Sequence, residues 1–200
     1  MNSSKENILH AASELFLEGG THALSVRAIA KRAGVSTMGI YSHFEGKQGI
    51  LEALYIEGFE AVDNAMSVFD QGLAPREAVL AAANNYFDLA ERSPAHYSLV
   101  FGPSDAGYTP SDAAQQAGAK AFGKLLLLAK TALPEVASDE EAQMAAMRTW
   151  SMLHGAVSLR QHAIAEFVQM QNWREEVLES VLMLFDGFVE RSNQRSIERS

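Results

Sequence analysis

The chain has 200 residues, of which 48% are apolar and 20% charged, a globular composition with room for one large domain or two small ones. It contains no cysteine, which excludes disulfides and thiolate metal sites. The first residues lack the apolar region of a secretory signal, and no apolar run reaches the roughly 18 residues that a membrane span needs. We therefore expect a cytoplasmic protein with no membrane partner.

The net charge of −9 is divided unevenly along the chain. Residues 1–47 hold five Lys and Arg against four Glu, whereas residues 48–200 hold 11 basic and 21 acidic side chains. A nucleic-acid backbone would therefore meet the first part and be repelled by the second.

Apolar residues recur with helical spacing throughout and period-two alternation is lacking, which predicts an all-α fold of about nine helices. The first helix begins at Ser3, where Glu6 completes a capping box, and ends at Gly19-Gly20. A long helix, about 47–70, leads into the acidic part without a linker. Further helices are expected from Pro75 onward and over about 94–101, 112–132, 139–167 and 173–191, with a loop over 102–112.

The segment between the first helix and the long one reads LSVRAIAKRAGVSTMGIYSHFEGK, residues 24–47. Ser25 is placed to cap a short helix and Gly34 to end it. Ser36 can then cap a second short helix, 37–44, whose outward side chains are hydrogen-bonding, basic and aromatic. This pattern predicts a helix-turn-helix with a surface suited to DNA, continuous with the long helix.

These residues resemble the TetR family of bacterial transcription regulators. The similarity runs through Leu15-Phe16, Gly19-Gly20, residues 24–30, 33–36 and 40–44, Lys47 and Leu51. The letters WSMLHG, residues 150–155, are similar to a Trp…His-Gly segment in the ligand-binding half of one subgroup. The resemblance implies a homodimer joined by the last two helices, an inducer pocket in each C-terminal half, and repression that ligand releases.

In a DNA complex the second short helix would lie in the major groove. By resemblance, Tyr41, His43 and Lys47 match positions that contact the DNA backbone, although Tyr41 and His43 could instead pack within the protein. Many relatives carry a basic residue at the position of Thr37 or Ser42, and this chain carries neither. The candidate DNA-binding residues are Ser25, Arg27, Ser36, Thr37, Met38, Gly39, Tyr41, His43 and Lys47.

Aromatic, methionine and histidine side chains of the C-terminal part are candidates for the wall of an apolar ligand pocket. The same spacing also fits an ordinary helical core. Trp150 and His154 lie one turn apart and share a face. The candidates are Tyr86, Phe87, Tyr97, Phe101, Phe122, Met147, Trp150 and His154. The histidines lack carboxylates at matching spacing, so we expect neither a metal nor another cofactor.

The last two helices carry more apolar residues than one neighbouring helix can cover, which predicts a homodimer interface. A dimer would also place two reading helices about 34 Å apart on a palindromic site. The candidate interface residues are Val157, Ile164, Val177, Val181, Leu184, Phe185 and Phe188.

Together these patterns predict a DNA-binding domain, 1–47, and a ligand-binding and dimerisation domain, 48–200. The predicted function is that of a ligand-responsive repressor, which binds a palindromic operator as a homodimer and is released by a small, largely apolar effector. No glycine-rich phosphate loop or nucleophile motif is present, so we do not expect an enzyme. The alternative is a helical small-molecule-binding or interaction protein without specific DNA binding.

Overall fold

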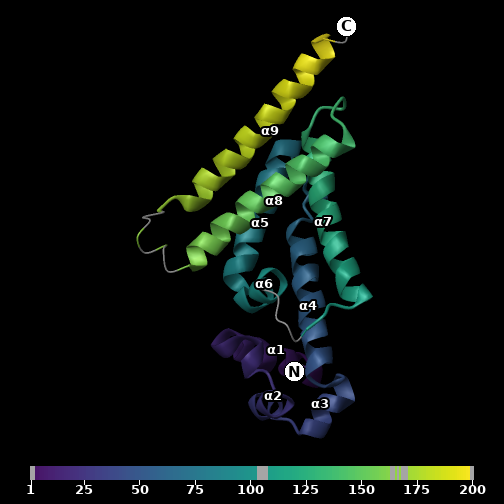
Figure 1. The fold of residues 1–200 in the computed structure, drawn as a ribbon, viewed down its shortest axis with the longest axis vertical. Helices are drawn as coiled ribbons and strands as arrows, with labels where there is room; N and C mark the ends of the chain where they lie inside the picture. Colours follow the sequence, from purple (N-terminus) through teal and green to yellow (C-terminus); the bar gives the residue numbers. More distant parts are fainter. Residues whose placement is uncertain (1–2, 103–107, 163–164, 166, 168–170, 199–200) are drawn as a thin grey trace. The chain divides into compact units, whose positions relative to one another are not determined.

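The computed structural model describes residues 3–102, 108–162, 165, 167 and 171–198. In this part of the chain it forms nine α-helices and two short 3-10 helices without any strand, which confirms the predicted fold class (Figure 1). The elements are α1 (Ser4–Gly19), η1 (Gly20–Ala23), α2 (Val26–Ala33), α3 (Thr37–His43), α4 (Gly46–Ala65), η2 (Phe69–Gln71), α5 (Pro75–Arg92), α6 (Pro94–Phe101), α7 (Asp112–Ala132), α8 (Asp139–Gln161) and α9 (Trp173–Glu198).

Side-chain caps begin helices where the sequence predicts them. The Ser3 hydroxyl accepts a hydrogen bond from the Glu6 amide at 3.3 Å, and the Glu6 carboxylate accepts one from the Ser3 amide at 2.9 Å. Ser138 and Glu141 form the same reciprocal pair at the start of α8. These bonds satisfy amide groups that the first turn of a helix leaves without a partner.

The predicted end of the long helix is wrong: α4 ends at Ala65 rather than near residue 70. The Ser67 hydroxyl donates to the carbonyl of Asp63 at 2.8 Å, and the side chain of Val68 is buried. The chain then turns through η2 and reaches Gly72, which has a φ of +66°. Burial of Val68 therefore takes the backbone off the helical path that the apolar spacing predicted.

The last two helices also differ from their predicted bounds. The helix α8 ends at Gln161 and not at Phe167, whose side chain is 84% exposed and adds nothing to a buried stripe. The helix α9 runs to Glu198, beyond the predicted end at Arg191. Apart from Ile197, residues 192–198 are polar, so apolar spacing gave no signal for them.

Contacts between Cα atoms divide the chain into two compact units. Unit 1 comprises residues 1–61 and 92–119, and unit 2 comprises residues 62–91 and 120–200. The helices α4 and α7 each contribute residues to both units. The predicted domains, 1–47 and 48–200, were assigned by function and not by contacts. The two units do not test that division, and it stays a prediction.

In unit 1 the first four helices share one core. Ile8 of α1, Ile29 of α2, Ile40 of α3 and Ile50 of α4 are all fully buried in it. Each of the four lies at helical spacing from another apolar residue of its own helix or, for Ile40, from Phe44 at the helix end, which places it on a buried face. The three-helix motif is therefore held directly against the first turns of α4.

Polar contacts also fix the start of α7 within unit 1. The carboxylate of Glu52 on α4 accepts hydrogen bonds from the Tyr108 hydroxyl at 2.7 Å and from the Ser111 hydroxyl. The Ser111 hydroxyl oxygen in turn accepts from the amide of Ala114 in the first turn of α7. Burial and the bond to Glu52 both raise the pKa of Tyr108, so this phenol stays a donor at neutral pH.

In unit 2, α8 and α9 pack against each other along their length (Figure 1). Large fully buried side chains of this unit come from α5, α7, α8 and α9, and Val68 after α4 is also fully buried. Those on the four helices include Tyr86, Phe87, Leu128, Leu153, Val181 and Phe188.

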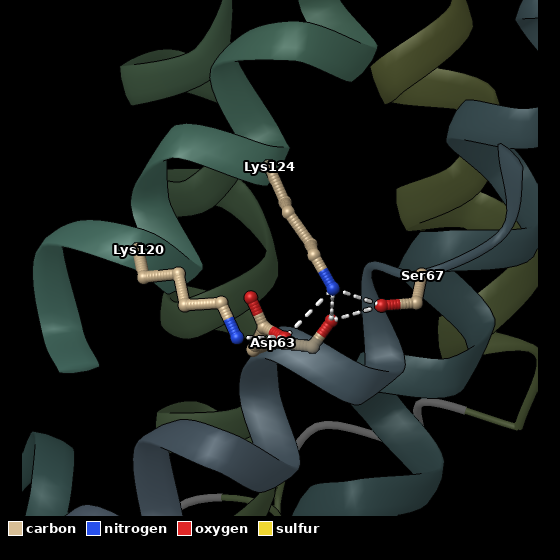
Figure 2. Close-up of polar contacts among 4 residues, drawn as sticks. All are labelled: Asp63, Ser67, Lys120 and Lys124. Carbon is tan, nitrogen blue, oxygen red and sulfur yellow. Dashed lines mark hydrogen bonds and ion pairs between the residues drawn. The ribbon is translucent and has the colours of Figure 1, made fainter.

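A buried ion pair joins α4 to α7 in unit 2 (Figure 2). The Asp63 side chain is only 7% exposed, and its Oδ2 lies 2.7 Å from Lys124 Nζ and 3.3 Å from Lys120 Nζ. Lys124 also donates to the Asp63 carbonyl at 3.2 Å and to the Ser67 hydroxyl. A cation thus lies against a carbonyl group in the last turn of α4, where the helix dipole favours positive charge.

The Asp63 pair gives a pH-dependent stability prediction. Burial alone would raise the pKa of Asp63, but the hydrogen bonds and charges of Lys124 and Lys120 outweigh it and lower that pKa. The stabilisation is therefore present above the ordinary aspartate pKa and is lost as pH falls through the lowered value. We expect Asp63→Asn to reduce the free energy of unfolding by about 1–3 kcal/mol at neutral pH, with the difference from wild type shrinking in acid.

Denaturant unfolding at a series of pH values measures this effect. The control is Asp139→Asn, because Asp139 is exposed and pairs at 2.6 Å with an exposed lysine, Lys130. Such surface pairs contribute little, so this variant should unfold like wild type. An Asp63→Asn deficit that persists unchanged in acid would contradict the assignment.

Candidate nucleic-acid interface

The helix α2 is capped by Ser25, whose hydroxyl accepts a hydrogen bond from the amide of Ala28 at 3.1 Å. Ile29 and Ala30 are buried, and the opposite face exposes Arg27 and Lys31. Among the described residues, neither of these two cations has an ion-pair partner. Their charge is therefore available to an external anion.

Arg32, also on α2, is held differently. Its guanidinium lies 2.9 Å from the Glu18 carboxylate and 3.4 Å from that of Glu14, both on α1. The hydrogen bond to Glu18 raises the pKa of Arg32, and the same bond lowers the pKa of Glu18. Arg32 therefore joins α2 to α1 rather than presenting an unpaired charge.

The turn between α2 and α3 depends on one glycine. Gly34 has a φ of +68°, in the left-handed region that side chains with a Cβ rarely adopt. The chain then reaches Ser36, whose hydroxyl accepts a hydrogen bond from the amide of Gly39 at 3.0 Å. These two residues set the angle at which α3 leaves the turn.

The helix α3 has a buried face and an exposed face. Ile40 is fully buried, and Phe44 beyond the helix end is also buried. On the other side Met38 is 76% exposed and Tyr41 is 61% exposed, while Thr37 and His43 are exposed as well. The structure therefore places the predicted reading side chains on one short helix and leaves them uncovered within the chain.

Tyr41 has a neighbour that the sequence analysis missed. Gly46, the first residue of α4, has a φ of +70°, and a Cβ built on it would lie 3.2 Å from Cε1 of Tyr41. The Tyr41 ring therefore lies directly over Gly46, at the beginning of α4. The sequence signal for this contact was Gly46 itself, a glycine that stands directly before Lys47 at the start of a helix.

Lys47 lies in the first turn of α4. Its Nζ donates to the carbonyl of Thr21 in η1 at 2.6 Å and is partly buried. An ammonium has three N–H donors, so this bond leaves capacity for another acceptor. Lys47 thus ties the start of α4 to η1, the turn that follows the first helix, and it lies a few residues after Tyr41 and His43 in the sequence.

The predicted ligand-binding residues are spread over four helices and both units. Tyr97 and Phe101 lie on α6 in unit 1, with ring centroids 5.1 Å apart. The other six lie in unit 2: Tyr86 and Phe87 on α5, Phe122 on α7, and Met147, Trp150 and His154 on α8.

Two aromatic contacts within unit 2 involve these residues. The rings of Phe122 and Trp150 have centroids 6.3 Å apart, and burial lowers the pKa of His154 one turn along α8. Phe87 meets Trp173 at 4.7 Å between ring centroids. It also lines a cleft of about 180 Å³ whose other walls are Ala90, Glu91, Val157, Arg160, Gln161 and Trp173.

Most predicted dimer residues are buried inside one chain. Val157, Val181, Phe185 and Phe188 are buried, and Val177 and Leu184 are partly exposed. Ile164 lies outside the described residues. Among the side chains that the structure describes on α8 and α9, the large exposed apolar ones are Met144, Met147, Leu159 and Met183.

In the described part of the chain, no group of three or more His, Asp or Glu side chains is arranged to hold a metal ion. None of the described helices is both long and apolar enough to cross a membrane.

Two family models match the chain. The model of bacterial regulatory proteins of the tetR family matches residues 8–54. The model of the tetracyclin repressor-like C-terminal domain matches residues 79–185. The first match contains α2 and α3, and the second covers more than half of the chain.

Individual relatives agree with these matches. The HTH-type transcriptional activator FasR of Mycolicibacterium smegmatis is 39% identical over 113 residues, which are 54% of this chain and about half, 49%, of FasR. A protein of unknown function from Rhodococcus sp. RHA1 has a similar fold, with a TM-score of 0.77 at 21% identity over 94% of this chain and 97% of that one. The SmeT–triclosan complex has a TM-score of 0.65 at 19% identity and covers 91% of each chain.

The matched family consists of transcriptional regulators and not of enzymes. The tetR family model covers α2 and α3, the two helices that expose Arg27, Lys31, Met38 and Tyr41. The chain therefore belongs to the TetR family of bacterial transcriptional regulators, and its N-terminal helix-turn-helix is the DNA-binding part.

Proposed function

We propose that this regulator is a ligand-responsive repressor of the cytoplasm, which binds a palindromic operator as a homodimer. The observation that carries the proposal is the exposed face of α3. Met38, a large apolar side chain, is 76% exposed there beside exposed Thr37. Apolar and hydroxyl groups on a helix that enters the major groove can contact thymine methyl groups and base edges.

The homodimer is supported by the exposed surface of α8 and α9. Met144 and Met147 lie one turn apart on α8, and Met183 is exposed on α9. Burial of such side chains against a second copy would remove apolar surface from water. Val157, Val181, Phe185 and Phe188 would then support this surface from beneath.

A small, largely apolar effector is proposed to release the operator. The support is the set of aromatic side chains in unit 2, among them Phe122 and Trp150, and the fold shared with SmeT, which was solved with triclosan. An effector can act only if it binds the DNA-free state more tightly than the DNA-bound state.

Activation is the second candidate, because FasR is named as an activator. The two roles are separated by transcription from a promoter that carries the selected operator, with purified polymerase and regulator. Repression predicts fewer transcripts when regulator is added, and activation predicts more.

Selection of bound sequences from random double-stranded DNA tests the proposed function. We expect an enriched inverted repeat whose half-sites lie about one helical turn apart, or a multiple of it. A chain that enriches no sequence, as the alternative of a helical interaction protein requires, would overturn the proposal.

Lys47→Ala should weaken binding to all DNA sequences by a similar factor, because an ammonium near a phosphate carries no base information. The slope of log affinity against log salt should fall by roughly one per subunit. Fluorescence anisotropy at several salt concentrations measures both. Lys130→Ala, at an exposed lysine of α7 outside the DNA-binding helices, is the control for loss of one positive charge; an equal effect of the two changes would contradict a specific role for Lys47.

A further inference from the structure

A cleft of about 180 Å³ lies in unit 2, where residues of α5, α8 and α9 come together. Its apolar walls are Phe87 and Ala90 of α5, Val157 of α8 and Trp173 of α9. Each of these side chains is largely buried, so the packing around it holds the wall in place. Phe87 is the one predicted ligand-binding residue among the described residues that line this cleft.

Two of the walls are aromatic rings in contact. The ring centroids of Phe87 and Trp173 lie 4.7 Å apart, and the ring planes meet at 65°. A further ring can approach such a pair edge to face or offset, the arrangements that aromatic groups prefer. An apolar cavity of about 150 Å³ can hold one benzene molecule. The cleft therefore has the size and the walls for a single aromatic ring.

The carboxylate in the wall of the cleft is already paired. Glu91 is the one acidic side chain among the described lining residues, and it lies 2.8 Å from the guanidinium of Arg174. The same guanidinium lies 2.8 Å from Asp88. Arg174 directly follows Trp173, so these two ion pairs fix the start of α9 to the last turns of α5.

Arg160 also lines the cleft, near the end of α8, and its charge is not used in this way. Its guanidinium carbon lies 5.6 Å from the ring centroid of Trp173, within the range of a cation–π contact. The side chain is exposed, and among the described residues no carboxylate forms an ion pair with it. A guanidinium beside a ring keeps its N–H donors for an acceptor, and their planar fork matches a carboxylate.

We propose that this cleft binds a small aromatic carboxylate. The ring occupies the space beside Val157 and Trp173, and the carboxylate accepts hydrogen bonds from Arg160. Glu91 favours a monoanion over a dianion, because it places another negative charge at the same cleft. Arg174 positions Trp173 and Glu91 and does not contact the ligand.

This binding goes beyond the proposed function and does not rest on it. The cleft shares no residue with the contact between Phe122 and Trp150, which supports the proposed effector. Neither DNA nor a second copy of the chain is needed. A ligand in the cleft would contact α5, α8 and α9 together and so stabilise the folded chain by mass action.

Benzoate, benzamide and acetate provide the test. Benzoate carries both the ring and the charge, benzamide has the same shape without the charge, and acetate has the charge without the ring. The full chain is titrated with each compound at constant ionic strength, and heats of binding are measured. We expect benzoate to bind at least about tenfold more tightly than either of the others, as hydrogen bonds to a charged group and burial of a ring predict. Equal affinity for benzoate and either of the other two, or no binding of benzoate, would overturn the proposal.

Two arginines of α8 provide matched variants that locate the binding. Arg160→Gln removes the cation from the cleft and should abolish the preference for benzoate over benzamide. Arg148→Gln is the control, because Arg148 is also exposed on α8 and its guanidinium carbon lies 5.4 Å from the ring centroid of Phe188, which does not line the cleft. If the two variants bind benzoate with the same affinity, the assignment of the carboxylate to Arg160 is wrong.

Melting curves give a second measurement on the same variants. Benzoate should raise the melting temperature of the wild type and of Arg148→Gln, and should raise that of Arg160→Gln less. An equal rise in all three proteins would contradict the site. If the chain selects no DNA sequence, the proposed function fails while these results still stand; if it selects an operator and shows no preference for benzoate, only this inference fails.

Discussion

Ile40→Ala should lower the free energy of unfolding by about 2–5 kcal/mol and abolish specific DNA binding. The Ile40 side chain is fully buried against Ile8, Ile29 and Ile50, so its removal loses apolar burial and leaves a cavity. That core fixes α3 against α1, α2 and α4. The loss of packing therefore disorders the reading helix even where the chain stays folded.

Denaturant unfolding followed by circular dichroism measures the stability, and anisotropy with labelled operator measures the binding. Met38→Ala is the control on the same helix, because Met38 is exposed and the core does not need it. It should change the free energy of unfolding by no more than about 0.5 kcal/mol. If both variants lose the same stability, the inward and outward faces of α3 have been assigned incorrectly.

Gly39→Ala should stabilise the protein and weaken operator binding at the same time. A Cβ on Gly39 would lie 3.5 Å from Val35 Cβ and 3.6 Å from Ser36 Oγ, which are ordinary van der Waals contacts. Alanine is favoured over glycine in a helix by up to about 1 kcal/mol, so the protein itself has no need of a glycine here. We infer that the missing side chain serves a close approach by DNA, and that operator affinity falls at least about tenfold.

Gly34→Ala is the matched control for this prediction. Gly34 is in the left-handed region, with a φ of +68°, so alanine there is strained and should destabilise the chain. Melting curves and operator titrations on both variants separate the two causes. A Gly39→Ala protein that gains stability and keeps full operator affinity would show that DNA does not use the space at Gly39.

The N-terminal motif was predictable because its signals are local. The hydroxyls of Ser25 and Ser36 cap helices that begin one residue later, and Gly34 ends the first of them. The end of α4 was not predictable in this way. It depends on Val68, buried after the helix, and on Lys124, which reaches the last turns of α4 from a distant part of the chain.

The outward face of α3 could be predicted residue by residue, since one buried position, Ile40, fixes the direction of the others. The position of the Tyr41 ring over Gly46 could not, because it depends on the angle between two helices. The C-terminal part resists prediction for another reason. A pocket wall and a core both require apolar side chains turned inward, so the pattern that selected Phe87 as a ligand residue fits either.

A selection with Met38→Gln tests most directly whether the exposed face of α3 reads bases. Glutamine can donate and accept hydrogen bonds at an adenine edge, where methionine makes apolar contacts. Sequences are selected from random DNA with the wild-type and variant proteins under the same salt conditions. We expect the preference to change at one symmetric pair of base positions and to stay the same elsewhere; an identical preference for both proteins would contradict the claim.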